Sequence, residues 1–222
     1  MKAVYISHSG FFVELEKTAF LFDYMKGEIP ETDKKLFVFV SHRHPDHYNN
    51  DIFKLRDRGN VAFVLSSDIR LKEKAEDIIS LKPNVVCDIE GIKVQTLKST
   101  DEGVAFIISA EGKRIFHAGD LNLWIWRGET KQYNNNMKAL FEKYTEPLKG
   151  LSFDVGFMPL DPRLEETSFS GLDAYLKIAE FKRIFPMHFW GNYDIIKRYK
   201  ADRGLSAENV IVIEREGQEF TI

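Results

Sequence analysis

Short apolar stretches, separated by glycine or charged residues, dominate the first part of the chain. The stretches at residues 2–6, 11–15 and 19–22 predict three short strands of an antiparallel meander. The run Leu36–Val40 has no polar alternation, which is typical of a strand that is buried on both faces. We therefore expect the fold to begin with a sheet.

Beyond this run, strand-like and helix-like segments succeed one another. Further strands are predicted at residues 61–65, 85–87, 92–97, 104–109, 113–116, 155–158, 184–185, 210–213 and 219–222. Helices are predicted at residues 50–58, with Asn50-Asp51 as cap and Gly59 as stop, and at residues 68–81, 130–149, 170–181 and 194–201. Ser170 and Asp173 have the spacing of a capping box. Two halves of this kind fit an α/β fold with two face-packed sheets and helices outside.

The polar segment after Val40 holds three of the six histidines of the chain in the order Ser-His-Arg-His-Pro-Asp-His. A regular helix cannot gather His42, His44, Asp46 and His47 on one side, because residues two apart point in nearly opposite directions and proline breaks the helix. A tight turn at a strand end can gather them. Imidazole and carboxylate groups suit zinc, iron or manganese, so the segment predicts a metal site. The alternative is a solvated turn that merely contains histidines.

Three other predicted strand ends, one before the histidine segment and two after it, also carry candidate polar residues: Asp23, the pair Gly119-Asp120, and His188. Each would be unremarkable alone, since a Gly-Asp pair usually marks a turn and an isolated histidine usually packs in a core. Together with the histidine segment, in this order, they resemble the motifs of the metallo-beta-lactamase superfamily over residues 23–188. That resemblance implies a four-layered αββα sandwich, with the metals at one edge between the sheets.

Carried over position by position, the resemblance implies two metal sites that share a carboxylate. The ligands of the first metal would be His42 and His44, those of the second Asp46, His47 and His188, and the shared ligand Asp120. Asp23 would accept a hydrogen bond from a ligand imidazole and fix its tautomer, without touching the metal.

The chain departs from the family pattern at one position. A histidine is expected shortly before residues 103–106, where the chain reads Ser-Thr-Asp-Glu-Gly-Val. Thr100 occupies the aligned position, but Asp101 is the better ligand chemically. An oxygen-rich first site would weaken the preference for Zn²⁺ and favour Mn²⁺ or Fe²⁺, and an incomplete site would leave one metal instead of two. Similar segments occur in the branch that resembles L-ascorbate-6-phosphate lactonase and uncharacterised metal-dependent hydrolases.

Hydrolysis is the reaction that these ligands favour, because a divalent metal lowers the pKa of bound water toward about 7. We expect a hydroxide between the metals to attack a carbonyl or phosphoryl centre, with Asp46 orienting it and accepting its proton. An ester, a lactone or a phosphoester of a small molecule would each be a suitable substrate. Candidate residues of the substrate pocket are His8, Trp124, Asp161, Arg163 and Trp190, and Arg163 would suit an anionic substrate group.

Composition narrows the alternatives. The 222 residues, 44% of them hydrophobic, suffice for one domain over residues 1–222, and neither repeats nor linkers divide it. Because 31 basic and 34 acidic residues are interspersed, no basic tract supports a nuclease or phosphodiesterase that acts on nucleic acid. A noncatalytic metal-binding protein is a further alternative. The single cysteine and the lack of a signal-peptide core or membrane span predict a cytoplasmic protein. The oligomeric state is not predicted.

Overall fold

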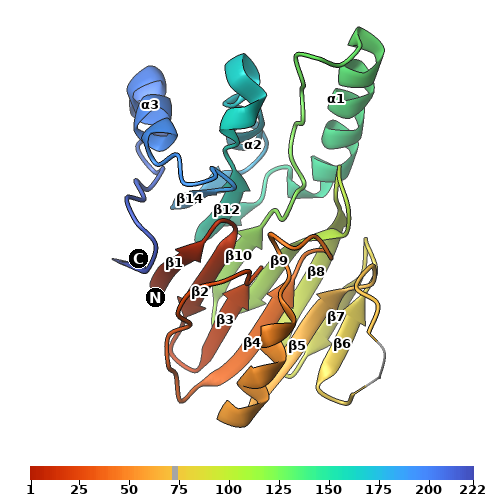
Figure 1. Cartoon of the computed structure of the whole chain (residues 1–222), viewed down its shortest axis with the longest axis vertical. Helices are drawn as coiled ribbons and strands as arrows, with labels where there is room; N and C mark the ends of the chain where they lie inside the picture. The colour runs from red at the N-terminus through yellow and green to blue at the C-terminus, as the bar shows by residue number, and fades with distance from the viewer. Residues whose placement is uncertain (72–74) are drawn as a thin grey trace.

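Two sheets packed face to face form the centre of the computed structural model, which describes residues 1–71 and 75–222 (Figure 1). The first sheet consists, in spatial order, of β15 (Gln218–Thr221), β1 (Lys2–Ser7), β2 (Gly10–Glu14), β3 (Thr18–Phe22), β4 (Lys35–Val40), β5 (Val61–Ser66) and β6 (Ile78–Leu81). The second consists of β14 (Ile184–Met187), β12 (Val155–Pro159), β10 (Lys113–His117), β9 (Val104–Ala110), β8 (Ile92–Lys98) and β7 (Val86–Ile89). A short parallel pair, β11 (Ser152–Phe153) and β13 (Glu180–Phe181), lies beside them.

Alternation of side chains along the strands explains the layers. In β4, Phe37 and Phe39 point into the core between the sheets, whereas Leu36, Val38 and Val40 join a second apolar cluster with the 3₁₀ helix η1 (Asn50–Arg58). This strand is therefore buried on both faces, as predicted. The opposite sheet is covered by helices that Figure 1 shows side by side: α1 (Lys131–Thr145), α2 (Ser170–Ile178) and α3 (Asp194–Arg203). The four-layered sandwich is confirmed, with a thin first helical layer.

Side-chain hydrogen bonds to backbone amides fix the starts of two helices. Asn49 accepts a hydrogen bond from the Asp51 amide at the start of η1, one residue before the predicted cap. Thr130 caps α1 in the same way through the Tyr133 amide. That helix ends at Thr145 and continues as η2 (Glu146–Leu148), so the prediction over residues 130–149 is close. The remaining 3₁₀ segments are η3 (Pro162–Thr167) and η4 (Gly204–Ala207).

Three predictions were wrong. Residues 78–81 of the predicted helix at 68–81 form β6, because they pair in parallel with β5, while residues 72–74 lie outside the described part of the chain. The helix predicted at 170–181 ends at Ile178, and the predicted capping box does not form, since Asp173 instead binds Arg203. Residues 210–213 are not a strand, because only Val210 bridges to Ile184. In the first two cases a tertiary partner overrides the local pattern, and in the third the pairing with β14 does not extend beyond a single bridge.

Candidate metal centre

The histidine segment forms a tight turn at the end of β4. The carbonyl of His44 accepts hydrogen bonds from the amides of His47 and Tyr48, both at 2.9 Å, which closes the turn around Pro45. Gly103 lies directly against this turn with a φ of 69°, and a Cβ atom there would be 2.0 Å from the carbonyl oxygen of Ser41. Only glycine allows that approach, so this contact brings the loop that follows β8 up to the histidines.

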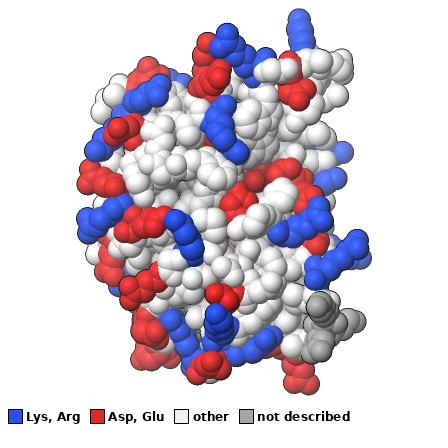
Figure 2. All heavy atoms as spheres, viewed as in Figure 1, with Lys and Arg blue, Asp and Glu red and all other residues white. Residues whose placement is uncertain are grey.

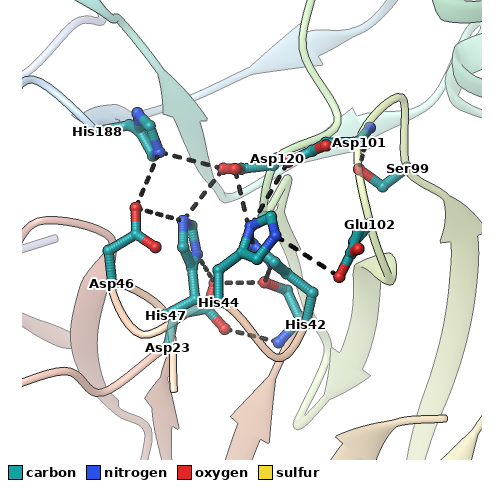
Figure 3. Close-up of polar contacts among 12 residues, drawn as sticks. Asp23, His42, His44, Asp46, His47, Ser99, Asp101, Glu102, Asp120 and His188 are labelled. Atoms are coloured by element: carbon teal, nitrogen blue, oxygen red, sulfur yellow. Dashed lines mark hydrogen bonds and ion pairs between the residues drawn. The ribbon is translucent and has the colours of Figure 1, made fainter. Parts of the chain in front are cut away.

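Four side chains of this region converge on one point, and we call them the first cluster: His42, His44, Asp101 and Asp120. The Nε2 atom of His42 lies 3.0 Å from Nδ1 of His44 and 3.6 Å from Oδ2 of Asp120. Oδ2 of Asp101 is 3.6 Å from Nδ1 of His44. Figure 3 shows Asp101 and Asp120 approaching the histidines from the opposite sheet.

A second group of four side chains, which we call the second cluster, lies next to the first: His8, Asp46, His47 and His188. Oδ2 of Asp46 lies 3.7 Å from Nε2 of His188. The other oxygen of Asp120, Oδ1, is 3.2 Å from Nε2 of His47 and 3.4 Å from Nε2 of His188. Asp120 thus presents one carboxylate oxygen to each cluster (Figure 3).

Two buried carboxylates hold the imidazoles from behind. Oδ2 of Asp23 lies 2.7 Å from Nδ1 of His47, which is the contact expected of it. Oδ2 of Asp161 lies 2.9 Å from Nδ1 of His188 and also accepts a hydrogen bond from Arg163. Each carboxylate leaves the Nε2 atom of its histidine directed into the second cluster. This orientation is the one that a metal ligand needs.

The pKa values of the clustered side chains shift in different directions. Burial alone would lower the pKa of His47, but the carboxylates of Asp120 and Asp23 raise it well above its usual value. Burial and the neighbouring His47 lower the pKa of His42 to about 4. Burial would raise the pKa of Asp120, yet the surrounding histidines hold it well below the usual range. Burial and Asp120 raise the pKa of Asp101.

The structure separates the two candidates for the missing histidine. The hydroxyl of Thr100 donates to the carbonyl of Asn122 at 2.7 Å and accepts from its amide at 2.9 Å, so it serves the loop backbone. Asp101, by contrast, belongs to the first cluster and faces the adjoining pocket. Of the two residues, Asp101 is the one placed to bind a metal.

A pocket of about 270 Å³ opens over the clusters. Its floor includes His44, Asp46, Asp101, Asp120 and His188, and its walls include Thr100, Trp124, Trp126, Tyr133, Met137 and Arg163. Acidic side chains gather in a hollow near the middle of the face that Figure 2 shows. The pocket therefore combines a negative floor with a largely aromatic wall, at the end of α1.

The predicted pocket residues divide into two groups. Trp124 and Arg163 line the pocket, and the Trp124 indole donates to the Asp120 carbonyl at 3.0 Å. His8, Asp161 and Trp190 do not line it. His8 and Asp161 are buried around His188, and Trp190 packs edge-on against the His8 ring, with ring centres 4.5 Å apart. The sequence analysis assigned these three to the substrate pocket; in the structure they lie outside the pocket lining, and a role in substrate binding stays a prediction.

One histidine was not assigned a function from the sequence. His117 is fully buried, lies 3.1 Å from the carbonyl of Ser9 through Nε2, accepts from the Gly119 amide through Nδ1, and stacks on Phe22. Both ring nitrogens are thus occupied by the backbone. His117 ties the two sheets together beneath the clusters.

The donor atoms fit divalent metal ions. Within the described residues, the Nε2 atoms of His8, His47 and His188 and the Oδ1 atom of Asp120 are buried without a hydrogen-bond partner. Buried polar atoms are rarely left unsatisfied, and these four all face the second cluster. A cation held in the second cluster would satisfy them together, and nitrogen and carboxylate oxygen are the donors that zinc, manganese and iron accept.

Comparison with known proteins agrees with this geometry. A family model described as a beta-lactamase superfamily domain matches residues 2–135. The chain belongs to the metallo-beta-lactamase superfamily. This member is 24% identical to a "UPF0173 metal-dependent hydrolase" of Korarchaeum cryptofilum, over all of both chains. It is 25% identical to a protein with the same description from Thermoplasma acidophilum, over 84% of this chain and 81% of the relative.

Solved structures of other proteins share the fold. Igni18, a metallo hydrolase from Ignicoccus hospitalis, is 19% identical with a TM-score of 0.65, over 100% of this chain and 98% of that one. The metallo-beta-lactamase fold protein YhfI from Bacillus subtilis is 14% identical with a TM-score of 0.63, over 99% and 98%. The specific resemblance to the ascorbate-6-phosphate lactonase branch stays a prediction. In the described part of the chain, every helix is too short or too polar to cross a membrane.

Proposed function

We propose that this chain is a metal-dependent hydrolase whose substrate is a small-molecule ester, lactone or phosphoester. The observation that carries the proposal is the pair of His/Asp clusters that share Asp120 at the floor of a pocket. Relatives over the full length of the chain are described as metal-dependent hydrolases. A divalent metal bound there would lower the pKa of bound water and polarise the bond to be cleaved.

The metal-holding residues follow from the two clusters. His42, His44 and Asp101 would hold one ion, Asp46, His47 and His188 the other, and Asp120 both. Zn²⁺ fits these donors, and Mn²⁺ or Fe²⁺ fit the additional carboxylate that replaces a histidine.

Asp46 is the residue that we assign to the attacking water. Burial would raise the pKa of Asp46, but the contact with His8 and the charge of His47 bring it well below the usual range, so the group is a carboxylate at neutral pH. It is also one of the residues that line the pocket. A carboxylate in this place orients the water by accepting a hydrogen bond and can accept its proton.

The pocket walls favour a compact substrate with an apolar part. Trp124 and Trp126 stack in parallel with ring centres 6.1 Å apart, and they face the floor of the pocket. The Arg163 guanidinium, fixed by Asp161, lies at the same wall and would bind a carbonyl or anionic oxygen of the substrate. Because basic and acidic residues are interspersed and form no basic tract, a nucleic acid is the weaker candidate substrate.

The proposal is tested with a panel of nitrophenyl esters, lactones and phosphodiesters, with Zn²⁺, Mn²⁺ or Fe²⁺ added to metal-free protein. We expect metal-dependent hydrolysis of at least one class. Asp46→Asn should then lower turnover on the order of 10²- to 10⁴-fold, the usual contribution of acid–base catalysis. Asp51→Asn, at an exposed carboxylate on η1, is the matched control and should leave turnover unchanged. An absence of hydrolysis across the panel, in protein shown to bind metal, would contradict the proposal.

A further inference from the structure

His8 lies in the turn between β1 and β2, far in sequence from every segment that carries the other candidate ligands. Its backbone is in the left-handed region, with a φ of 51°, and its carbonyl accepts a hydrogen bond from the His188 amide at 3.2 Å. Positive φ is uncommon for residues other than glycine. The turn is thus held in an unusual conformation that attaches it directly to the loop of His188.

This conformation aims the His8 side chain into the second cluster. Nε2 of His8 is 3.3 Å from Oδ2 of Asp46, and the His8 ring centre is 4.3 Å from that of His188. The residue is only 6% exposed. No described residue makes a hydrogen bond to its Nε2 atom, although this atom lies among polar groups.

We propose that His8 is a direct ligand of the metal held by the second cluster. The inference rests on the proposed metal centre and adds a residue to it. The ligand-bearing atoms of His8, Asp46, His47 and His188 all lie within 4.8 Å of one another, so a single ion can contact all four. Trp190 covers the outer side of the His8 ring and keeps it turned inward.

The proposal also gives the two sites different sets of protein ligands. The first cluster has two histidines and gains Asp101 where a third histidine was expected, whereas the second cluster gains His8. With Asp120 included, the second metal would have five protein ligands. That number exceeds the three protein ligands usual at a catalytic zinc and favours a five- or six-coordinate ion such as Mn²⁺, Fe²⁺ or Co²⁺.

The test counts the imidazoles bound to metal. In protein labelled with ¹⁵N-histidine and loaded with two equivalents of paramagnetic Co²⁺, a contact shift of the ring signals requires a bond to the metal, and this contact shift is what is counted here. We expect five contact-shifted histidines and no contact shift at His117. His8→Asn keeps a residue that tolerates positive φ but is too short to reach the ion. It should leave four shifted histidines and weaken Co²⁺ binding at one site by about 100-fold or more, above the 10- to 100-fold typical of losing a hydrogen-bond partner of a ligand.

His44→Asn is the matched control, since it removes an imidazole from the first cluster instead. It should also leave four shifted histidines, with His8 among them. Two bound Co²⁺ ions with only four shifted histidines in the unmodified protein, His8 being unshifted, would overturn the proposal and leave the hydrolase proposal standing. If one ion binds, a shifted His8 signal supports the proposal and an unshifted one overturns it. Failure to bind Co²⁺ at all would overturn both.

Discussion

Replacement of Asp23 by asparagine should disable the second cluster through the tautomer of one histidine. Oδ1 of Asp23 accepts a hydrogen bond from the Ser41 amide at 2.7 Å, while Oδ2 lies 2.6 Å from the Ser41 hydroxyl and 2.7 Å from Nδ1 of His47. All three partners donate to the carboxylate. Asparagine keeps the shape and tolerates the φ of 40° found here, but presents an NH₂ group in place of one oxygen.

The consequence is worked out at the His47 ring. If the asparagine amide donates to Nδ1, the ring proton moves to Nε2, the atom that lies 3.2 Å from Oδ1 of Asp120. A protonated Nε2 cannot bind a metal. The loss of such a hydrogen-bond partner typically weakens metal binding 10- to 100-fold, or about 1.4–2.8 kcal/mol. The metal-free protein should also lose about 1–3 kcal/mol of unfolding free energy, because a buried donor is left facing other donors.

The assay is a competition titration of Zn²⁺ or Co²⁺ against a chelating dye, with denaturant unfolding of the metal-free protein measured in parallel. Asp154→Asn is the matched control, because this carboxylate also accepts a backbone amide, that of Arg114, but at the start of β12 and away from the clusters. It should leave metal affinity unchanged. An Asp23→Asn protein that is destabilised but binds metal within about threefold of the original would refute the tautomer argument.

Four further predictions concern the same centre. Because the pKa of His47 is raised well above its usual value, metal binding near pH 7 should release about one proton from this residue, measured by calorimetry in buffers of different ionisation enthalpy. In the metal-free protein, the contribution of charged His47 to the free energy of unfolding should be complete below the unfolded-state pKa of about 6.5. It should be lost as the pH rises through the higher folded-state pKa. A free energy of unfolding, measured with denaturant, that increases over this pH range would contradict the prediction. Gly103→Ala should cost about 2–5 kcal/mol of unfolding free energy through strain and overlap with Ser41, whereas Gly128→Ala, with open space around it, should be nearly neutral. Asp101→Ala should weaken metal binding at the first cluster, measured by dye competition, whereas Thr100→Val should reduce stability by about 1 kcal/mol and leave metal affinity nearly unchanged.

Much of the fold follows from local pattern. The apolar run of β4, the opening meander and the position of most later strands could be predicted because each is bounded by glycine or charged residues. The errors lie where a partner decides the structure. Residues 78–81, Ile-Ile-Ser-Leu, follow a charged segment whose pattern indicates a helix, yet β5 offers them an unpaired edge. Asp173 has the sequence spacing of a capping residue, but in the fold its carboxylate pairs with Arg203, which is distant in sequence.

The candidate centre was predicted in part for a similar reason. His42, His44, Asp46 and His47 are adjacent in sequence, and Asp120 and His188 follow them in a recognisable order. His8 has no such neighbour, and its side chain reaches the second cluster only because the turn after β1 is bound to the His188 backbone. The contact of Asp161 with His188 could not be predicted from the sequence either. A carboxylate two residues before Arg163 suggests a surface ion pair, and only the fold brings it to Nδ1 of His188.

The most direct test is an anomalous difference map of crystals grown with Mn²⁺ and no chelator. The account predicts two peaks, one within the first cluster and one within the second, with an oxygen of Asp120 directed at each. The corresponding map of the Asp101→Ala protein should lose or weaken the first peak only. A map without a peak in either cluster, or with these side chains pointing apart, would contradict the account.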